Sequence, residues 1–146
     1  QMCIRDRGCL AVEYRTAETA PEVLTALRAL EDPATRVAVR AERALLLRLE
    51  AGCAAPVGAF AQLETDDAGN TVLVLEAVVA DPRDSGMQGP EILRETARTR
   101  LPAGFPAEAQ DVAAAEESAR CLGTEVAETL LGRGADRFTD AEAGRA

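Results

Sequence analysis

Two apolar runs joined by a short polar turn constrain the fold of this 146-residue chain more than any other feature. Val57–Glu64 has an apolar residue at every second position, and Thr71–Ala80 is a denser apolar run. Both patterns predict β-strands. The turn between them, Asp66–Asn70, contains a glycine and is far shorter than the crossover that joins parallel strands. The sequence therefore predicts an antiparallel hairpin.

A third strand and three helices complete the predicted fold. Glu91–Leu101 alternates charged with small or apolar residues, as a strand with one face in water does. Helices are predicted at Pro21–Leu30, Pro33–Ala51 and Ala107–Gly132, because each has an apolar stripe at helical spacing. The predicted fold class is α+β, a three-stranded antiparallel sheet with helices packed on one face.

The Pro33–Ala51 helix has clear signals at both ends. Asp32 is predicted as its N-cap with a proline at the first helical position, and Gly52 as its left-handed C-terminal cap. Arg48 falls on the apolar side, where we expect its long stem to carry the charge out to water. The opposite, solvated face is predicted to carry Arg36, Arg40 and Arg43.

The composition limits which residues can form the core and which functions the chain can have. Alanine supplies 30 residues and aromatic residues only 3%, so we expect a lean core of closely packed, alanine-rich helices. The net charge of −9 argues against binding to nucleic acid or to an anionic membrane surface. No apolar run approaches the roughly 18 residues of a membrane span. We expect a cytoplasmic protein with reduced thiols.

The ends of the chain differ from its middle. Residues 1–7 match nothing that follows, and we expect them to be a non-native segment. Residues 8–20 are interpreted as a remnant of a preceding domain segment, because the alternation in Gly8–Arg15 predicts a strand that has no partner nearby. The main domain is expected at residues 21–136, followed by a frayed acidic tail at residues 137–146.

Cys53 is the one residue whose surroundings suggest chemistry. It lies between the long helix and the first strand, among small residues that leave room beside the sulfur. The chain has no histidine, and the negative C-terminal end of a helix does not activate a thiol. Cys53 is therefore either an inert core thiol or the partner of a strong, cationic electrophile.

The other candidate residues have weaker signals. Glu42 and Glu50 could act as acids, but nothing pairs them with a second carboxylate. Cys121 falls among three glutamates, whose charge disfavours a thiolate, and we expect it to be a spectator. The four cysteines have no CxxC spacing, so no metal site is predicted.

The segment around Cys53 resembles a known family. Arg40–Ala59, RAERALLLRLEAGCAAPVGA, is similar to the signature of the porphobilinogen deaminases, also called hydroxymethylbilane synthases. Gly8–Arg15 resembles a strand of that family, and Val112–Asp136 resembles its closing helix. Ala51 departs from the pattern, because a second glycine is usual there. The resemblance implies a C-terminal fragment of a three-domain enzyme, with the cofactor-attachment domain at residues 21–136.

The resemblance also implies a reaction. In that family the cysteine that matches Cys53 holds a dipyrromethane cofactor through a thioether. Four porphobilinogen molecules are added to it with loss of ammonia, and hydrolysis releases hydroxymethylbilane for porphyrin and heme biosynthesis. The catalytic aspartate and the substrate-binding arginines belong to the first two domains, so no catalytic residue is assigned here. We expect an inactive fragment of a monomeric transferase; the alternative is a non-enzymatic α+β interaction module with Cys53 in its core.

Overall fold

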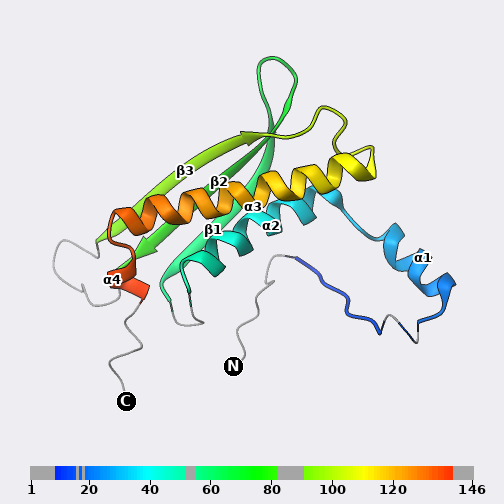
Figure 1. Ribbon diagram of the computed structural model, residues 1–146, viewed down its shortest axis with the longest axis horizontal. Helices are drawn as coiled ribbons and strands as arrows, with labels where there is room; N and C mark the ends of the chain where they lie inside the picture. The colour runs from blue at the N-terminus through cyan, green and yellow to red at the C-terminus, as the bar shows by residue number, and fades with distance from the viewer. Residues whose placement is uncertain (1–8, 16, 18, 52–54, 82–90, 140–146) are drawn as a thin grey trace.

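The computed structural model describes residues 9–15, 17, 19–51, 55–81 and 91–139 (Figure 1). In chain order its elements are α1 (Pro21–Ala29), α2 (Pro33–Arg48), β1 (Val57–Thr65), β2 (Thr71–Ala80), β3 (Ile92–Arg100), α3 (Ala109–Gly132) and α4 (Asp136–Thr139).

The three strands form one antiparallel sheet in the order β1-β2-β3. The hairpin register runs from Val57 opposite Val79 to Thr65 opposite Thr71. The turn is held by Asp66, whose carboxylate accepts hydrogen bonds from the backbone and side chain of Asn70 at 2.8 and 3.0 Å. The predicted meander is confirmed, and each predicted strand agrees with the observed one to within one residue at either end.

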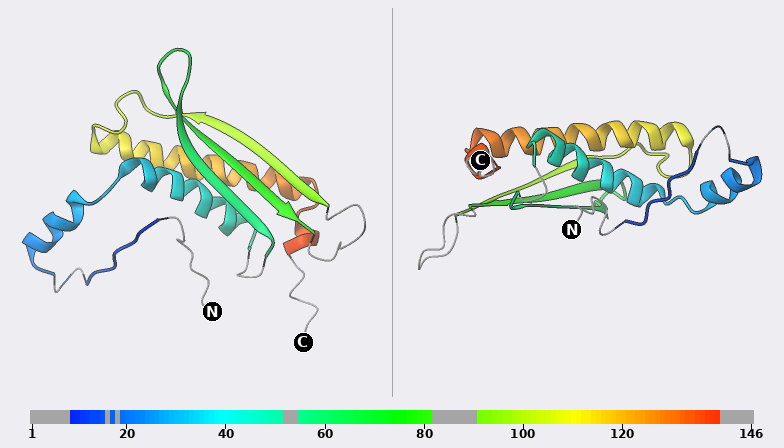
Figure 2. Two further views of the ribbon diagram at one scale, coloured as in Figure 1. Left: turned by 180° about the vertical axis from the view of Figure 1, so that it is seen from behind. Right: turned by 90° about the horizontal axis from the view of Figure 1, so that it is seen from below.

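Two long helices cover one face of this sheet (Figures 1 and 2). Arg36 of α2 binds Glu116 of α3 at 2.8 Å, and Arg48 binds Glu128 at 2.6 Å. Both pairs join residues 80 positions apart, so the two helices run parallel. The predicted α+β layer, with its helices on one face, is thus confirmed.

The two helices approach each other very closely at Gly123. A Cβ atom built on Gly123 would lie 2.2 Å from the carbonyl oxygen of Ala41 and 2.9 Å from the Cβ of Ala44. Ala115 and Ala119, on the same face of α3, are fully buried. The alanine-rich contact allows the small apolar side chains of this chain to make a packed core, as the composition predicts.

The start of α2 follows its sequence signals. Asp32 accepts hydrogen bonds from the backbone N–H of Ala34 at 3.1 Å and from the hydroxyl of Thr35 at 2.6 Å. These bonds hold the pKa of Asp32 below its usual range, the Thr35 bond having the larger effect. Asp32 is therefore the N-cap that the sequence predicts. At the other end, α2 finishes at Arg48 rather than at Ala51.

The strand expected at the N-terminus is not formed in the residues that the structure describes, whereas its expected lack of a partner strand is confirmed. Leu10–Arg15 has no regular secondary structure and joins no sheet. Leu10, Val12 and Tyr14 are exposed, and no residue of α1 is buried. An alternating pattern forms a strand only when a neighbouring strand accepts its hydrogen bonds.

The C-terminal end also differs from the expectation. The tail was expected to fray from residue 137, but Asp136–Thr139 forms the short helix α4. Phe138 within it is only 1% exposed and belongs to the main core. Gly134, with φ of +88°, turns the chain so that this aromatic ring packs inward. The packed domain therefore extends beyond residue 136.

Candidate functional site

The end of α2 leads directly towards Cys53. Glu50, with φ of +50°, takes the left-handed position at this helix end. The N–H of Glu50 binds the carbonyl of Leu47 at 3.2 Å, and the N–H of Ala51 binds that of Leu46 at 3.1 Å. This is the Schellman pattern, which glycine usually closes. The sequence predicts Gly52 in that role; Gly52 and Cys53 lie outside the described residues, and the turn is already made by Glu50.

The residues on either side of the 52–54 segment are held at one end of the sheet. Ala51, Ala55 and Pro56 are all half-buried. The N–H of Ala80, the last residue of β2, binds the carbonyl of Pro56 at 3.0 Å. Close by in the ladder, Asp81 donates to the carbonyl of Glu91 at 2.9 Å. The chain that follows the 52–54 segment is therefore bonded to the end of β2.

The chemistry available beside this segment is limited. The carbonyl end of α2 is negative, and Glu50 adds an exposed carboxylate to it. The chain has no imidazole that could take a proton from a thiol. Such surroundings favour a cationic reaction partner over an anionic one, and they leave a thiol without an activating base.

Glu42 has a structural role in the fold. Its Oε1 accepts a hydrogen bond of 2.8 Å from the N–H of Ala61 on the outer edge of β1. Partial burial raises the pKa of Glu42, and the Ala61 bond opposes that rise. An edge strand with unpaired N–H groups invites other strands to pair with it. Glu42 closes one of those positions.

The arginines of α2 lie on the outside of the molecule, as the sequence predicts. Arg36, Arg40, Arg43 and Arg48 are all exposed. Arg36 also forms ion pairs with Glu31 and with Glu116. Arg48 reaches solvent and meets Glu128, a partner that the sequence analysis does not foresee.

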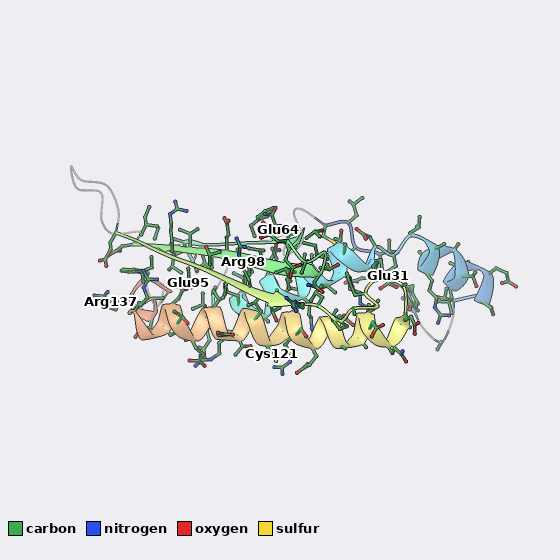
Figure 3. All side chains as sticks on the ribbon, turned by 90° about the horizontal axis from the view of Figure 1, so that it is seen from above. Glu31, Glu64, Glu95, Arg98, Cys121 and Arg137 are labelled. Atoms are coloured by element: carbon green, nitrogen blue, oxygen red, sulfur yellow. The ribbon has the colours of Figure 1, made fainter. Side chains whose placement is uncertain are left out.

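Cys121 is exposed on the side of α3 that faces away from the sheet (Figure 3). Its sulfur lies 3.7 Å from a carboxylate oxygen of Glu117 and 3.7 Å from a guanidinium nitrogen of Arg120. The Arg120 hydrogen bonds lower the pKa of Glu117 to about 2, so this carboxylate stays charged beside the thiol. The sulfur thus lies equally far from a carboxylate and a guanidinium group, and the spectator role of Cys121 stays a prediction.

Two kinds of site are not found among the described residues. They contain no group of three or more histidine, cysteine, aspartate or glutamate side chains placed to hold a metal ion. Within the same residues, no helix combines the length and the apolar character that crossing a bilayer requires.

Sequence reasoning overlooked a shallow groove between α2 and α3. It is lined by residues of both helices: Arg40, Arg43, Ala44, Leu47, Arg48, Arg120 and Thr124. The sequence feature that could have indicated this groove is Leu47. It is a large apolar residue that lies off the buried stripe of its helix and is 80% exposed. Arg120 could not be assigned to the groove, because the parallel pairing of two distant helices is not visible in the sequence.

The structure defines a class: a small two-layer α+β domain in which the long helices α2 and α3 cover one face of a three-stranded antiparallel sheet. A sequence model of the porphobilinogen deaminase C-terminal domain matches residues 36–132, about two thirds of the chain. The chain therefore belongs to the porphobilinogen deaminase family, and it carries the C-terminal domain of that family.

Individual relatives agree with this family. The chain is 42% identical over 139 residues to a porphobilinogen deaminase of Cutibacterium acnes, covering 94% of this chain and 38% of the relative. It is 38% identical over 152 aligned positions to one of Micrococcus luteus, covering 89% and 39%. It is 56% identical to a porphobilinogen deaminase 1 of Streptomyces coelicolor over 66 residues, covering 45% and 19%. The chain thus spans less than two fifths of the length of these relatives.

Proposed function

We propose that this chain is the cofactor-attachment part of a longer porphobilinogen deaminase. That enzyme joins four porphobilinogen molecules into hydroxymethylbilane, with loss of ammonia, for porphyrin and heme biosynthesis. The observation that carries the proposal is the family match over residues 36–132, which includes the Cys53 segment. The deaminase names of the three relatives support it.

Cys53 is proposed to hold a dipyrromethane through a thioether. The cofactor supplies the free pyrrole position at which the product chain is extended. The described surroundings fit this group. Ala51 and Ala55 are small, Pro56 is bonded to the last residue of β2, and the negative end of α2 favours a cationic electrophile during attachment. This domain then binds and orients the cofactor rather than moving protons.

The rest of the reaction is assigned to residues outside this chain. No catalytic residue is proposed in this chain. The 146-residue chain alone is proposed to be inactive. The full-length enzyme is proposed to be a cytoplasmic monomer that binds neither nucleic acid nor membrane, consistent with the net charge of −9.

The proposed domain layout follows from burial. Residues 8–20 are assigned to a preceding domain of the full-length protein, since Leu10, Val12 and Tyr14 are exposed and would suit a strand in a larger sheet. Residues 1–7 are assigned to a non-native segment. The main domain is proposed to begin near Pro21 and to include Phe138, whose ring lies in the core; its packed part begins with α2, since no residue of α1 is buried.

The test is an activity assay on the full-length protein with two matched variants. Incubation with porphobilinogen should release ammonia and a linear tetrapyrrole. Cys53→Ser should abolish the activity, because serine cannot form the thioether, whereas Cys121→Ser on the outer face of α3 should keep it. Full activity of Cys53→Ser would refute the attachment role, and an inactive wild-type protein would refute the proposed reaction.

A further inference from the structure

We propose that Glu31 and Arg36 form an ionic joint that makes the short link between α1 and α2 rigid, so that α1 leaves the packed domain in one fixed direction. The proposal does not depend on the proposed function, since it concerns only contacts that the structure describes. Helix α1 projects away from the sheet (Figures 1 and 2), and none of its residues is buried. Its direction is therefore set by the link, Leu30–Asp32, rather than by packing.

The first part of the link continues α1. The N–H of Leu30 binds the carbonyl of Leu27 at 3.1 Å. The N–H of Glu31 binds the carbonyl of Arg28 at 3.2 Å. Bonds that span three residues tighten the last turn of a helix, so the backbone of Glu31 is attached to α1.

The second part of the link is attached to α2. The carboxylate of Glu31 forms an ion pair with Arg36, near the start of α2. The next residue, Asp32, accepts hydrogen bonds from the N–H of Ala34 at 3.1 Å and the hydroxyl of Thr35 at 2.6 Å. Glu31 is thus bonded to α1 through its backbone and to α2 through its side chain. Two successive residues bonded in this way leave the link few free rotations.

Arg36 is itself held in place by α3. Its Nε and Nη2 donate to the two carboxylate oxygens of Glu116 at 2.8 and 2.9 Å, and its Nη1 meets Glu31, which Figure 3 shows beside the start of α2. The bonds to Glu116 and then those to Glu31 raise the pKa of Arg36, so the guanidinium stays charged. An isolated surface ion pair contributes little to stability, whereas a two-pronged arginine within a network contributes more. Glu31 therefore binds a group that α3 has already fixed.

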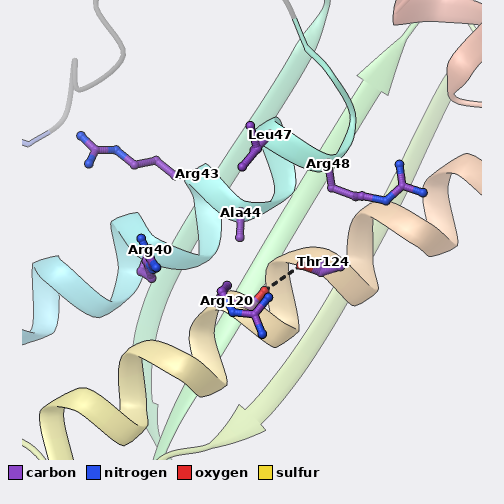
Figure 4. A pocket seen from close by; sticks show the side chains of 7 residues that line it. All are labelled: Arg40, Arg43, Ala44, Leu47, Arg48, Arg120 and Thr124. Carbon is purple, nitrogen blue, oxygen red and sulfur yellow. Dashed lines mark hydrogen bonds between the residues drawn. The ribbon is translucent and has the colours of Figure 1, made fainter.

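Arg120 provides a matched control for this joint. It is an exposed arginine that binds Glu117 through two nitrogens at 2.9 and 2.5 Å. Both residues belong to α3, and Arg120 lines the groove between α2 and α3 (Figure 4). Replacing Arg120 removes an ion pair of the same kind without changing any contact of the link.

The first test measures residual dipolar couplings of the backbone N–H groups in the weakly aligned 146-residue chain. In the wild type, the couplings of α1 should fit the same alignment as those of α2 and the strands. In Arg36→Leu and in Glu31→Gln they should fall at least two-fold, because α1 then samples many directions. Arg120→Leu should leave them unchanged. Couplings of α1 that are already averaged in the wild type, or that neither variant reduces, would overturn the proposal.

The second test measures hydrogen–deuterium exchange in the full-length protein, and it separates a joint from an ion pair that only stabilises the domain. Glu31→Gln keeps the bonds of Arg36 to α3. The N–H groups at positions 30 and 31 should exchange at least five-fold faster in this variant, whereas that of the buried Leu75 in β2 should not change. Glu117→Gln is the control and should change neither. Unchanged rates at positions 30 and 31, or an equal acceleration at Leu75, would overturn the proposal.

Discussion

Glu50 holds a conformation that its side chain disfavours. Its φ of +50° costs an L-residue roughly 1 kcal/mol, and its carboxylate lies at the negative end of α2. Glu50→Gly should therefore stabilise the domain by about 1 kcal/mol, seen as a higher urea midpoint. Glu50→Ala keeps the strained backbone and removes only the charge, so it should gain no more than a few tenths of a kcal/mol. A glycine variant no more stable than the alanine variant would contradict this account.

Glu42 should stabilise the fold through the hydrogen bond that its carboxylate accepts rather than through its negative charge. Glu42→Ala leaves the N–H of Ala61 without its partner and should cost about 1–3 kcal/mol of unfolding free energy. Glu42→Gln keeps an oxygen for that bond and should cost far less. If the two variants lose the same stability in urea titrations, the edge-closing role is wrong.

The pH dependence of Glu42 has a definite sign. Partial burial raises its pKa in the folded state, so folding is favoured while the carboxyl is protonated and this advantage is lost as pH rises through the folded-state pKa. Glu42→Gln should therefore gain stability relative to wild type as pH rises from about 4 to 7. A relative stability that falls over this range would contradict the direction of the shift.

At the scale of the elements, the contact between α2 and α3 at Gly123 leaves no room for a larger side chain. Gly123→Ala would place a methyl group 2.2 Å from the backbone oxygen of Ala41, which cannot move without shifting the helix. We expect a loss of at least 1–3 kcal/mol, measured by thermal or urea unfolding. The matched control is Gly132→Ala at the end of α3, where a Cβ meets nothing within 4 Å. That variant should be neutral or stabilising by up to about 1 kcal/mol.

The same contact shows which elements the sequence could predict. The strands were predictable because a five-residue turn and an alternating pattern leave one pairing. The buried stripe of α3, including Ala119 and Val126, followed from helical spacing. The parallel pairing of α2 with α3 was not predictable, because it depends on two distant helices meeting at Gly123.

The wrong expectations have physical reasons. Leu10–Arg15 alternates like a strand, but no strand of this domain accepts its hydrogen bonds. Phe138 was placed in a frayed acidic tail, whereas the turn at Gly134 brings its ring into the core. For the candidate site, the end of α2 was predicted to within three residues, whereas the left-handed Glu50 was missed because glycine is the usual residue there.

At the scale of the whole molecule, the domain has a packed core of its own, but under this account it needs the preceding part of the protein for activity. Its core joins α2, α3, α4 and all three strands. Residues 10–14 and α1 bury nothing among the described residues, and the Leu47 groove remains uncovered.

The most direct test of the central claim is the intact mass of the denatured full-length protein. We expect the mass of the polypeptide plus one dipyrromethane, an addition that survives denaturation because it is covalent. Cys53→Ser should lose the addition, and Cys121→Ser should keep it. The 146-residue chain alone should have the unmodified mass. A full-length protein that has the unmodified mass and still converts porphobilinogen would contradict the role proposed for Cys53.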